Sequence, residues 1–186
     1  MNVSIRLLLV GALLTGGIIA AKDDDDHMSG QHKAVLSGYD QVPAVYTPGT
    51  GLAVVEADET GKAVKVSLSY SGLKGAPKAA HIHLGQEGVN GGIVAALCGD
   101  GKPACPAQAS DLTLTINAAD IKAVQGVEAA ALDAVLDALT HDALYVSVQT
   151  DKFPDGELRG QLRRGMGENG NDDGDEKGKG KDKKNK

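Results

Sequence analysis

Aromatic residues, cysteine and positive charge are all scarce in this chain of 186 residues. It has no Trp, one Phe and four Tyr, so a hydrophobic core has to be filled mainly by Val, Leu, Ile and Ala. Two cysteines are too few for a disulfide-dense miniprotein or for a zinc site with four thiolates. Lys and Arg number 19 against 25 Asp and Glu, which argues against a nucleic-acid-binding domain because phosphate recognition needs a basic surface.

Composition divides the chain into four segments. Residues 1–21 combine Arg6 with an apolar run and end in small residues, which predicts a secretory signal peptide; an uncleaved membrane anchor is the alternative. Residues 22–32 are a polar linker whose KDDDDHM stretch resembles a vector-encoded sequence. Residues 165–186 contain one Met and no other apolar side chain apart from Gly, a composition typical of a disordered tail. The segment 33–164 is then one domain, exported to the periplasm or the cell exterior, with no integral membrane span in the mature chain.

Short β-rich runs bounded by turn residues fill most of this domain. We expect about eight strands, at residues 34–39, 51–57, 63–70, 79–84, 93–97, 112–116, 144–148 and 157–162. The stretch 117–139 differs, because Leu132, Val135, Leu136 and Leu139 recur at helical spacing and Asn117 can cap a turn. The predicted fold class is therefore mainly β, an antiparallel sandwich or barrel with one or two short helices.

Cys98 and Cys105 enclose a short segment that contains Gly and Pro. In an exported protein this arrangement favours a disulfide-closed loop. A redox-active or copper-binding thiol pair is the alternative that the residues leave open.

The segment AHIHLG contains the residues best suited to chemistry. Alternate residues of a strand point to the same face, so His81 and His83 project together, and two imidazoles so placed can bind one metal ion. The competing interpretation is structural, with both rings hydrogen-bonded to nearby loops.

A second pair of polar residues follows the turn sequence FPDG. Glu157 and Arg159 are expected on one face of the following strand, where a salt bridge would lock the hairpin. A functional role, with Arg159 facing an anion, is the alternative.

Three motifs in this order, AAHIHLGQEGVNGGIVAALC, LYVSVQT and FPDGELRGQL, resemble the CHRD domain, which is named after chordin and occurs widely in secreted bacterial proteins. The resemblance spans residues 33–162 and implies an immunoglobulin-like β-sandwich that acts as a binding module. The strand LYVSVQT usually ends in His-Thr in that family, but Gln149 stands here instead. A third metal ligand would then be Gln149 or His141.

The arrangement is also similar, more distantly, to a Cu,Zn superoxide dismutase, in which His81 and His83 would bind copper and Arg159 would attract an anion. The chain lacks the bridging and zinc-binding histidines of that family, and it has no esterase elbow, phosphate-binding loop or His-Glu-x-x-His motif. We therefore expect a binding module rather than an enzyme.

Three functions follow from these patterns. The first is a binding module that takes copper or zinc at His81 and His83, with a metal-bridged homodimer as one form of it. The second is a metal-free module for an extracellular protein partner. The third is a small copper oxidoreductase, which needs a redox-active ion with an open position.

Overall fold

The computed structural model describes residues 30–165. The predicted signal peptide, nearly all of the predicted linker and the predicted tail lie outside the described residues. Within them the chain forms nine strands, β1 (His32–Ser37), β2 (Thr50–Ala57), β3 (Ala63–Ser71), β4 (Pro77–Leu84), β5 (Gly92–Cys98), β6 (Ala109–Asn117), β7 (Leu144–Thr150), β8 (Leu158–Gln161) and β9 (Arg163–Arg164). It also forms one α-helix, α1 (Leu132–Thr140), and two 3-10 turns, η1 (Gly38–Asp40) and η2 (Ala118–Asp120).

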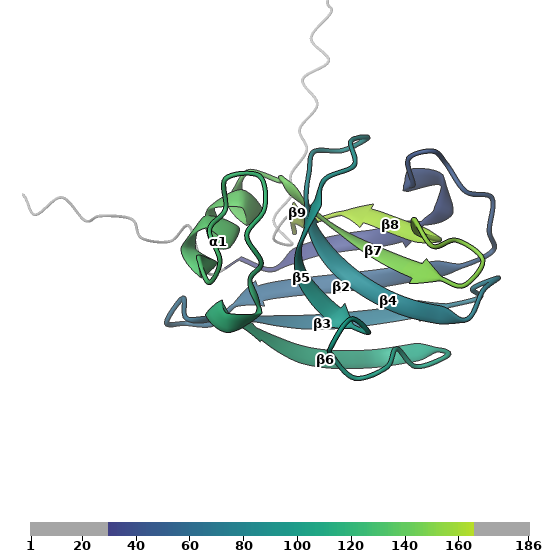
Figure 1. Ribbon diagram of the computed structural model, residues 1–186, viewed down its shortest axis with the longest axis horizontal. Coiled ribbons are helices and arrows are strands. Elements are labelled where there is room, and N and C mark those ends of the chain that lie inside the picture. Colours follow the sequence, from purple (N-terminus) through teal and green to yellow (C-terminus); the bar gives the residue numbers. More distant parts are fainter. Residues whose placement is uncertain (1–29, 166–186) are drawn as a thin grey trace, which may run out of the picture.

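The strands form one antiparallel sheet in the order β5-β4-β7-β8-β1-β2-β3-β6, with β9 also paired to β1. The sheet curls on itself so that β4, β7 and β8 lie across from β2, β3 and β6 (Figure 1). The two halves join where β1 meets β8, through the pair Ser37 and Arg159. This arrangement confirms the predicted fold class, a mainly antiparallel β-sandwich or barrel.

Alternating residues on each strand build the core between the halves. On β3, Val64, Val66, Leu68 and Tyr70 are buried, while the residues between them are exposed or half-buried. The turn before β3 is fixed by Asp58, whose carboxylate accepts hydrogen bonds from the backbone N–H groups of Lys62 and Ala63. All eight predicted strands are present, and the one strand in the described residues that the pattern did not predict is the two-residue β9.

Helix α1 covers one end of the curled sheet (Figure 1). Its residues Leu132, Val135, Leu136 and Leu139 all join the hydrophobic core, as their spacing predicted. Burial of each such side chain stabilises the fold by about 1.5–3 kcal/mol, so packing rather than helix propensity holds this short helix. No helix within residues 30–165 is both long and apolar enough to span a membrane.

Cys98 and Cys105 form a disulfide, with their Cα atoms 5.0 Å apart, which confirms the predicted closed loop. Cys98 is the last residue of β5, and it lies opposite Ala80 of β4. The loop is therefore attached directly beside the strand that carries the two histidines. Lys102 also ties it to η2, because its ammonium group lies 2.5 Å from a carboxylate oxygen of Asp120.

Removing this disulfide is expected to destabilise the protein moderately. Replacing both cysteines by serine should lower the free energy of unfolding by about 2.5 kcal/mol. The reason is that the disulfide restricts the unfolded chain, which gains conformational entropy when the loop is no longer closed. Urea unfolding of the oxidised wild type and of Cys98→Ser/Cys105→Ser measures the difference. Equal stability of the two proteins would contradict the expectation.

Candidate functional site: a buried polar layer around two histidines

The outward-facing positions of β4, β7 and β8 carry a set of polar and aromatic side chains, which we call the polar layer. The register places these side chains in rows across the three strands, on the face opposite the core. The polar layer consists of His81 and His83 on β4, Tyr145, Ser147 and Gln149 on β7, and Arg159 and Gln161 on β8. His81 and His83 therefore share one face, as the sequence predicted.

Loops bury most of this outward face. Five of the seven side chains are at most 9% exposed: His81, His83, Tyr145, Ser147 and Arg159. The loop after β1 contributes Gln41, whose amide donates a hydrogen bond to the Ser147 hydroxyl at 3.2 Å. The loop 85–91 covers β8, and the disulfide loop covers His81. The molecule thus has a second buried layer that is polar, outside its apolar core.

His81 is held through only one of its two ring nitrogens. Its Nε2 lies 2.8 Å from the Asp100 carboxylate, which can only accept, so Nε2 carries the hydrogen in this contact. Its Nδ1 is buried and has no hydrogen-bond partner in the described structure. In the neutral ring, Nδ1 is then a buried acceptor with an unused lone pair.

His83 shows the same arrangement with the nitrogens exchanged. Its Nδ1 lies 3.0 Å from the carbonyl oxygen of Gly91 and donates to it, whereas its buried Nε2 has no partner in the described structure. The ring stacks on Tyr145 with 4.7 Å between centroids. Burial lowers the pKa of His83, and the charges of His81 and Arg159 lower it further, against the raising effect of the Gly91 carbonyl. The ring is therefore neutral near pH 7.

Gln149 belongs to the same cleft. It lies opposite Ala79 on β4, and its side-chain amide donates to the Ser147 hydroxyl at 3.2 Å. Its Oε1 is buried without a partner in the described structure. A cleft of about 490 Å³ is lined by Gln149 together with both histidines and Asp100. Three residues that line one cleft thus each carry a buried acceptor without a partner in the described structure, and two of these acceptors are imidazole nitrogens.

His141, the other ligand considered from the sequence, lies elsewhere. It caps the C-terminal end of α1, where its Nδ1 is 2.8 Å from the carbonyl oxygen of Asp137. Its side chain is 71% exposed, and it does not line the cleft of the two histidines. The fold brings Gln149 to the histidine pair and leaves His141 outside.

The donor set fits a cation only in part. Each histidine presents one deprotonated nitrogen, which is the form that binds metals, and the opposite nitrogen is held by an acceptor as in metal-bound histidines. Within residues 30–165, however, no group of three or more His, Cys, Asp or Glu side chains is arranged to hold a metal ion. The protein thus supplies two strong ligands and the weak amide oxygen of Gln149.

Glu157 and Arg159 do not form the predicted salt bridge, because each has a different set of partners. The two Glu157 oxygens accept hydrogen bonds from the backbone N–H groups of Lys74 and Gly75 and from the hydroxyls of Thr47 and Thr150, at 2.5–3.1 Å. Burial alone would raise the pKa of Glu157, but these hydrogen bonds outweigh it and lower the pKa. Glu157 is a structural carboxylate that joins two loops to the end of β7.

Arg159 binds the loop 85–91 through hydrogen bonds from its guanidinium group. Its Nη2 donates to the carbonyl oxygens of Gln86 and Val89, both at 2.9 Å, and its Nη1 donates to the Asn90 side chain at 3.2 Å. The guanidinium carbon lies 3.7 Å from the centroid of the Tyr145 ring. Burial lowers the pKa of Arg159, although arginine remains charged at neutral pH.

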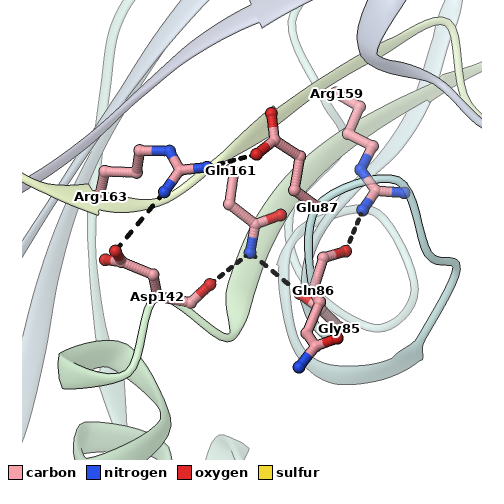
Figure 2. Close-up of polar contacts among 7 residues, drawn as sticks. All are labelled: Gly85, Gln86, Glu87, Asp142, Arg159, Gln161 and Arg163. Carbon is pink, nitrogen blue, oxygen red and sulfur yellow. Dashed lines mark hydrogen bonds and ion pairs between the residues drawn. The ribbon is translucent and has the colours of Figure 1, made fainter.

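Two neighbouring side chains complete this attachment, as Figure 2 shows. The Gln161 amide donates to the carbonyl oxygens of Gly85 and Asp142, at 2.9 and 2.7 Å. Arg163 pairs with the carboxylates of Glu87 and Asp142 at the surface. The loop that supplies the Gly91 carbonyl to His83 is thereby fixed to the C-terminal strands.

Sequence reasoning did not identify four of the residues that shape the site, namely Asp100, Gly91, Tyr145 and Ser147. Tyr145 and Ser147 alternate with Gln149 on one strand, so that alternation was a usable signal. Asp100 and Gly91 lie in loops, and nothing in the local sequence indicates which side chain a loop residue will contact.

Comparison with known proteins tests the family resemblance that the sequence motifs indicated. The family model of the CHRD domain matches residues 32–162. No curated protein and no solved structure matches the chain at a significant level. The resemblance indicated by the three motifs is confirmed, and it supports a binding module without assigning a metal or a partner. The similarity to Cu,Zn superoxide dismutases remains a prediction.

Proposed function

The chain belongs to the CHRD domain family, and we propose that it is an exported binding module that takes a divalent transition-metal ion, copper or zinc, at His81 and His83. The ligating atoms in this proposal are Nδ1 of His81 and Nε2 of His83, with Gln149 Oε1 as a weak third donor. Export is inferred from the predicted signal peptide and agrees with the disulfide, since disulfides persist in oxidising compartments.

One observation carries the proposal: His81 and His83 line the same cleft, and each keeps one buried ring nitrogen that has no hydrogen-bond partner within residues 30–165. Leaving a buried acceptor unsatisfied costs about 1–3 kcal/mol, so a fold that retains two of them in one place favours a ligand there. Both opposite nitrogens are held by acceptors, which fixes the tautomers that leave these lone pairs available.

The charges around the cleft favour a cation. Asp100, Asp151 and Asp155 line it, against the single cationic side chain of Lys78. Three carboxylates near a partly closed cleft raise the local concentration of positive ions. Imidazole nitrogens suit Cu(II) and Zn(II), and copper stands above zinc in the affinity order for such ligands.

Two imidazoles and one amide oxygen leave coordination positions for water or for a second molecule. A second copy of the chain could fill them, which is how the site would support a homodimer. Metal titration with simultaneous measurement of molecular mass tests for this dimer, since a bridging ion gives one metal per two chains.

The test is a calorimetric titration of the full chain with Cu(II) and, separately, with Zn(II). Wild type is expected to bind one ion with an affinity that His81→Ala/His83→Ala loses. His141→Ala is the matched control, because it removes an exposed imidazole outside the cleft and should bind as wild type does. All three proteins keep the acidic stretch 22–27, so weak binding there cancels in the comparison. Equal affinity of wild type and the double variant would contradict the proposal.

A metal-free module for an extracellular protein partner is the second candidate, and one feature favours it. Tyr39 and Tyr46 are 68% and 75% exposed and lie side by side, with 6.5 Å between ring centroids. Exposed tyrosines are enriched in protein interfaces because they bury a large apolar area and keep a polar group. Protein that carries no metal from its native compartment and takes up none in the titration would favour this function.

A further inference from the structure

The residue that holds His81 lies inside the disulfide loop. Asp100 is the second residue after Cys98, and Cys105 closes the loop behind it. Inside the loop, the N–H of Gly99 donates to the carbonyl of Pro103, and the N–H of Lys102 donates to the carbonyl of Gly99, both at 2.9 Å. The disulfide and these bonds give the loop a compact shape that carries Asp100 to His81.

The backbone at Asp100 also depends on this shape. Its φ angle is +46°, in the left-handed region that Asp, Asn and Gly enter more readily than other residues. Asp100 is about half exposed, so burial does not hold its carboxylate in place. The loop backbone and the 2.8 Å bond to His81 are what position it.

The contact with Asp100 decides which nitrogen of His81 is available. A carboxylate on Nε2 selects the tautomer with hydrogen on Nε2 and leaves the lone pair on Nδ1. Without that acceptor, either nitrogen can carry the hydrogen and the ring can rotate. His81 would then have to be ordered when an ion binds, which lowers the affinity.

We propose that Asp100 is a positioning residue for His81 and that the Cys98–Cys105 disulfide, by shaping the loop that carries Asp100, sets the metal affinity of the two-histidine cleft. This inference rests on the proposed function and deepens it: the closed loop holds Asp100 against His81 and gives a tight site, and a loop without the disulfide gives a weaker one.

The first experiment removes the carboxylate without straining the loop. Asp100→Gly keeps a residue that accepts positive φ, and it should weaken Cu(II) binding about 10- to 100-fold, the range typical for loss of a residue that supports a ligating histidine. Asp155→Asn is the matched control, because Asp155 lines the same cleft and its replacement removes the same charge without touching His81. Asp100→Asn keeps an acceptor oxygen and should recover part of the affinity. Equal losses in Asp100→Gly and Asp155→Asn would overturn the proposal.

A spectroscopic measurement tests positioning without any metal. The ¹⁵N chemical shifts of the His81 ring in the full metal-free chain distinguish a protonated from an unprotonated Nδ1. Wild type should show hydrogen on Nε2 alone, and Asp100→Gly should show a mixture of tautomers. An unchanged His81 tautomer in Asp100→Gly would overturn the proposal, whatever the chain binds.

The second experiment opens the loop. Serine replaces both cysteines, because free thiols would themselves bind copper. Cys98→Ser/Cys105→Ser should lower Cu(II) affinity in the same direction as Asp100→Gly. The triple variant should be no weaker than Asp100→Gly alone, since the disulfide acts through Asp100. Additive losses, or wild-type affinity in the serine variant, would overturn the role of the disulfide.

These outcomes separate this inference from the proposed function. Absence of binding by wild type defeats the proposed function, while the tautomer measurement still decides the role of Asp100. Tight binding by wild type together with unchanged binding in Asp100→Gly defeats only the inference.

Discussion

Replacing Glu157 by alanine is expected to lower the free energy of unfolding by about 3–5 kcal/mol. The side chain is fully buried, and its two oxygens accept four hydrogen bonds. Hydrogen bonds to a charged group contribute about 1.5–3 kcal/mol each, but bonds that share one carboxylate are not additive, so four of them contribute less than four times that amount. The loss is large because the donors come from three separate places in the fold: the loop at Thr47, the loop at Lys74 and Gly75, and the end of β7 at Thr150.

The substitution Glu157→Gln removes the charge of the side chain and keeps its shape, so it measures the two contributions separately. Glu157→Gln keeps one acceptor oxygen but turns an NH₂ group toward two donors, so it should lose roughly half as much unfolding free energy as Glu157→Ala.

The substitution Glu157→Gln also changes how stability depends on pH. The pKa of Glu157 in the folded state lies below its ordinary value of 4.5, so below pH 4.5 the unfolded state binds more protons than the folded state. Wild-type stability from this group is present above that pH and is lost as the pH falls through the folded-state pKa.

Urea unfolding between pH 3 and pH 7 measures both effects. Glu157→Gln should show a weaker fall in stability below about pH 4.5 than wild type, because it lacks this titrating group. Glu59→Gln is the matched control, since Glu59 lies exposed in the β2–β3 turn and should behave as wild type does. A Glu157→Gln protein with wild-type stability at pH 7 would show that the four hydrogen bonds contribute little.

Glu157 also shows which kind of contact could not be predicted from the sequence. The prediction that Glu157 and Arg159 share a strand face assumed that the strand begins at 157, but β8 begins at Leu158. Glu157 belongs to the preceding turn, where the two-residue period does not apply, and its side chain turns to loops that lie far away in sequence. Thr47, one of its partners, is separated from it by 110 positions. No local pattern encodes such a contact.

The histidine pair shows the opposite case. His81 and His83 lie within a strand whose alternate residues Ala80 and Ile82 are buried in the core, so the period fixed their common face. The disulfide was also predictable, because seven positions separate the cysteines and no other cysteine competes. The burial of the polar layer was not predictable. Outward-facing polar residues on a strand normally meet solvent, and here three loops cover them instead.

Replacement of Arg159 is the second change with a large expected effect on stability, because Arg159 links the loop 85–91 to the strand face that carries the two histidines. Replacing it by methionine should lower the free energy of unfolding by about 3–5 kcal/mol, since a buried hydrogen-bonded charge is lost and three oxygens of the loop lose their donors. Arg159→Lys should recover only part of this, because an ammonium group lacks the planar fork that reaches these acceptors and stacks on Tyr145.

Arg163 is the matched control for this prediction. It contacts the same loop through Glu87, but its side chain is 53% exposed, and exposed ion pairs contribute about 0–1 kcal/mol. Arg163→Met should therefore remain close to wild type in urea unfolding. Amide hydrogen exchange should show faster exchange in residues 85–91 of Arg159→Met and little change in Arg163→Met. The reason is that Arg159 binds backbone carbonyl groups of the loop, whereas Arg163 contacts the loop through the Glu87 carboxylate. Since Gly91 in this loop supplies the acceptor for His83, its loosening should also weaken Cu(II) binding. Equal effects of the two substitutions on stability and on exchange would mean that the surface pair, and not Arg159, fixes the loop.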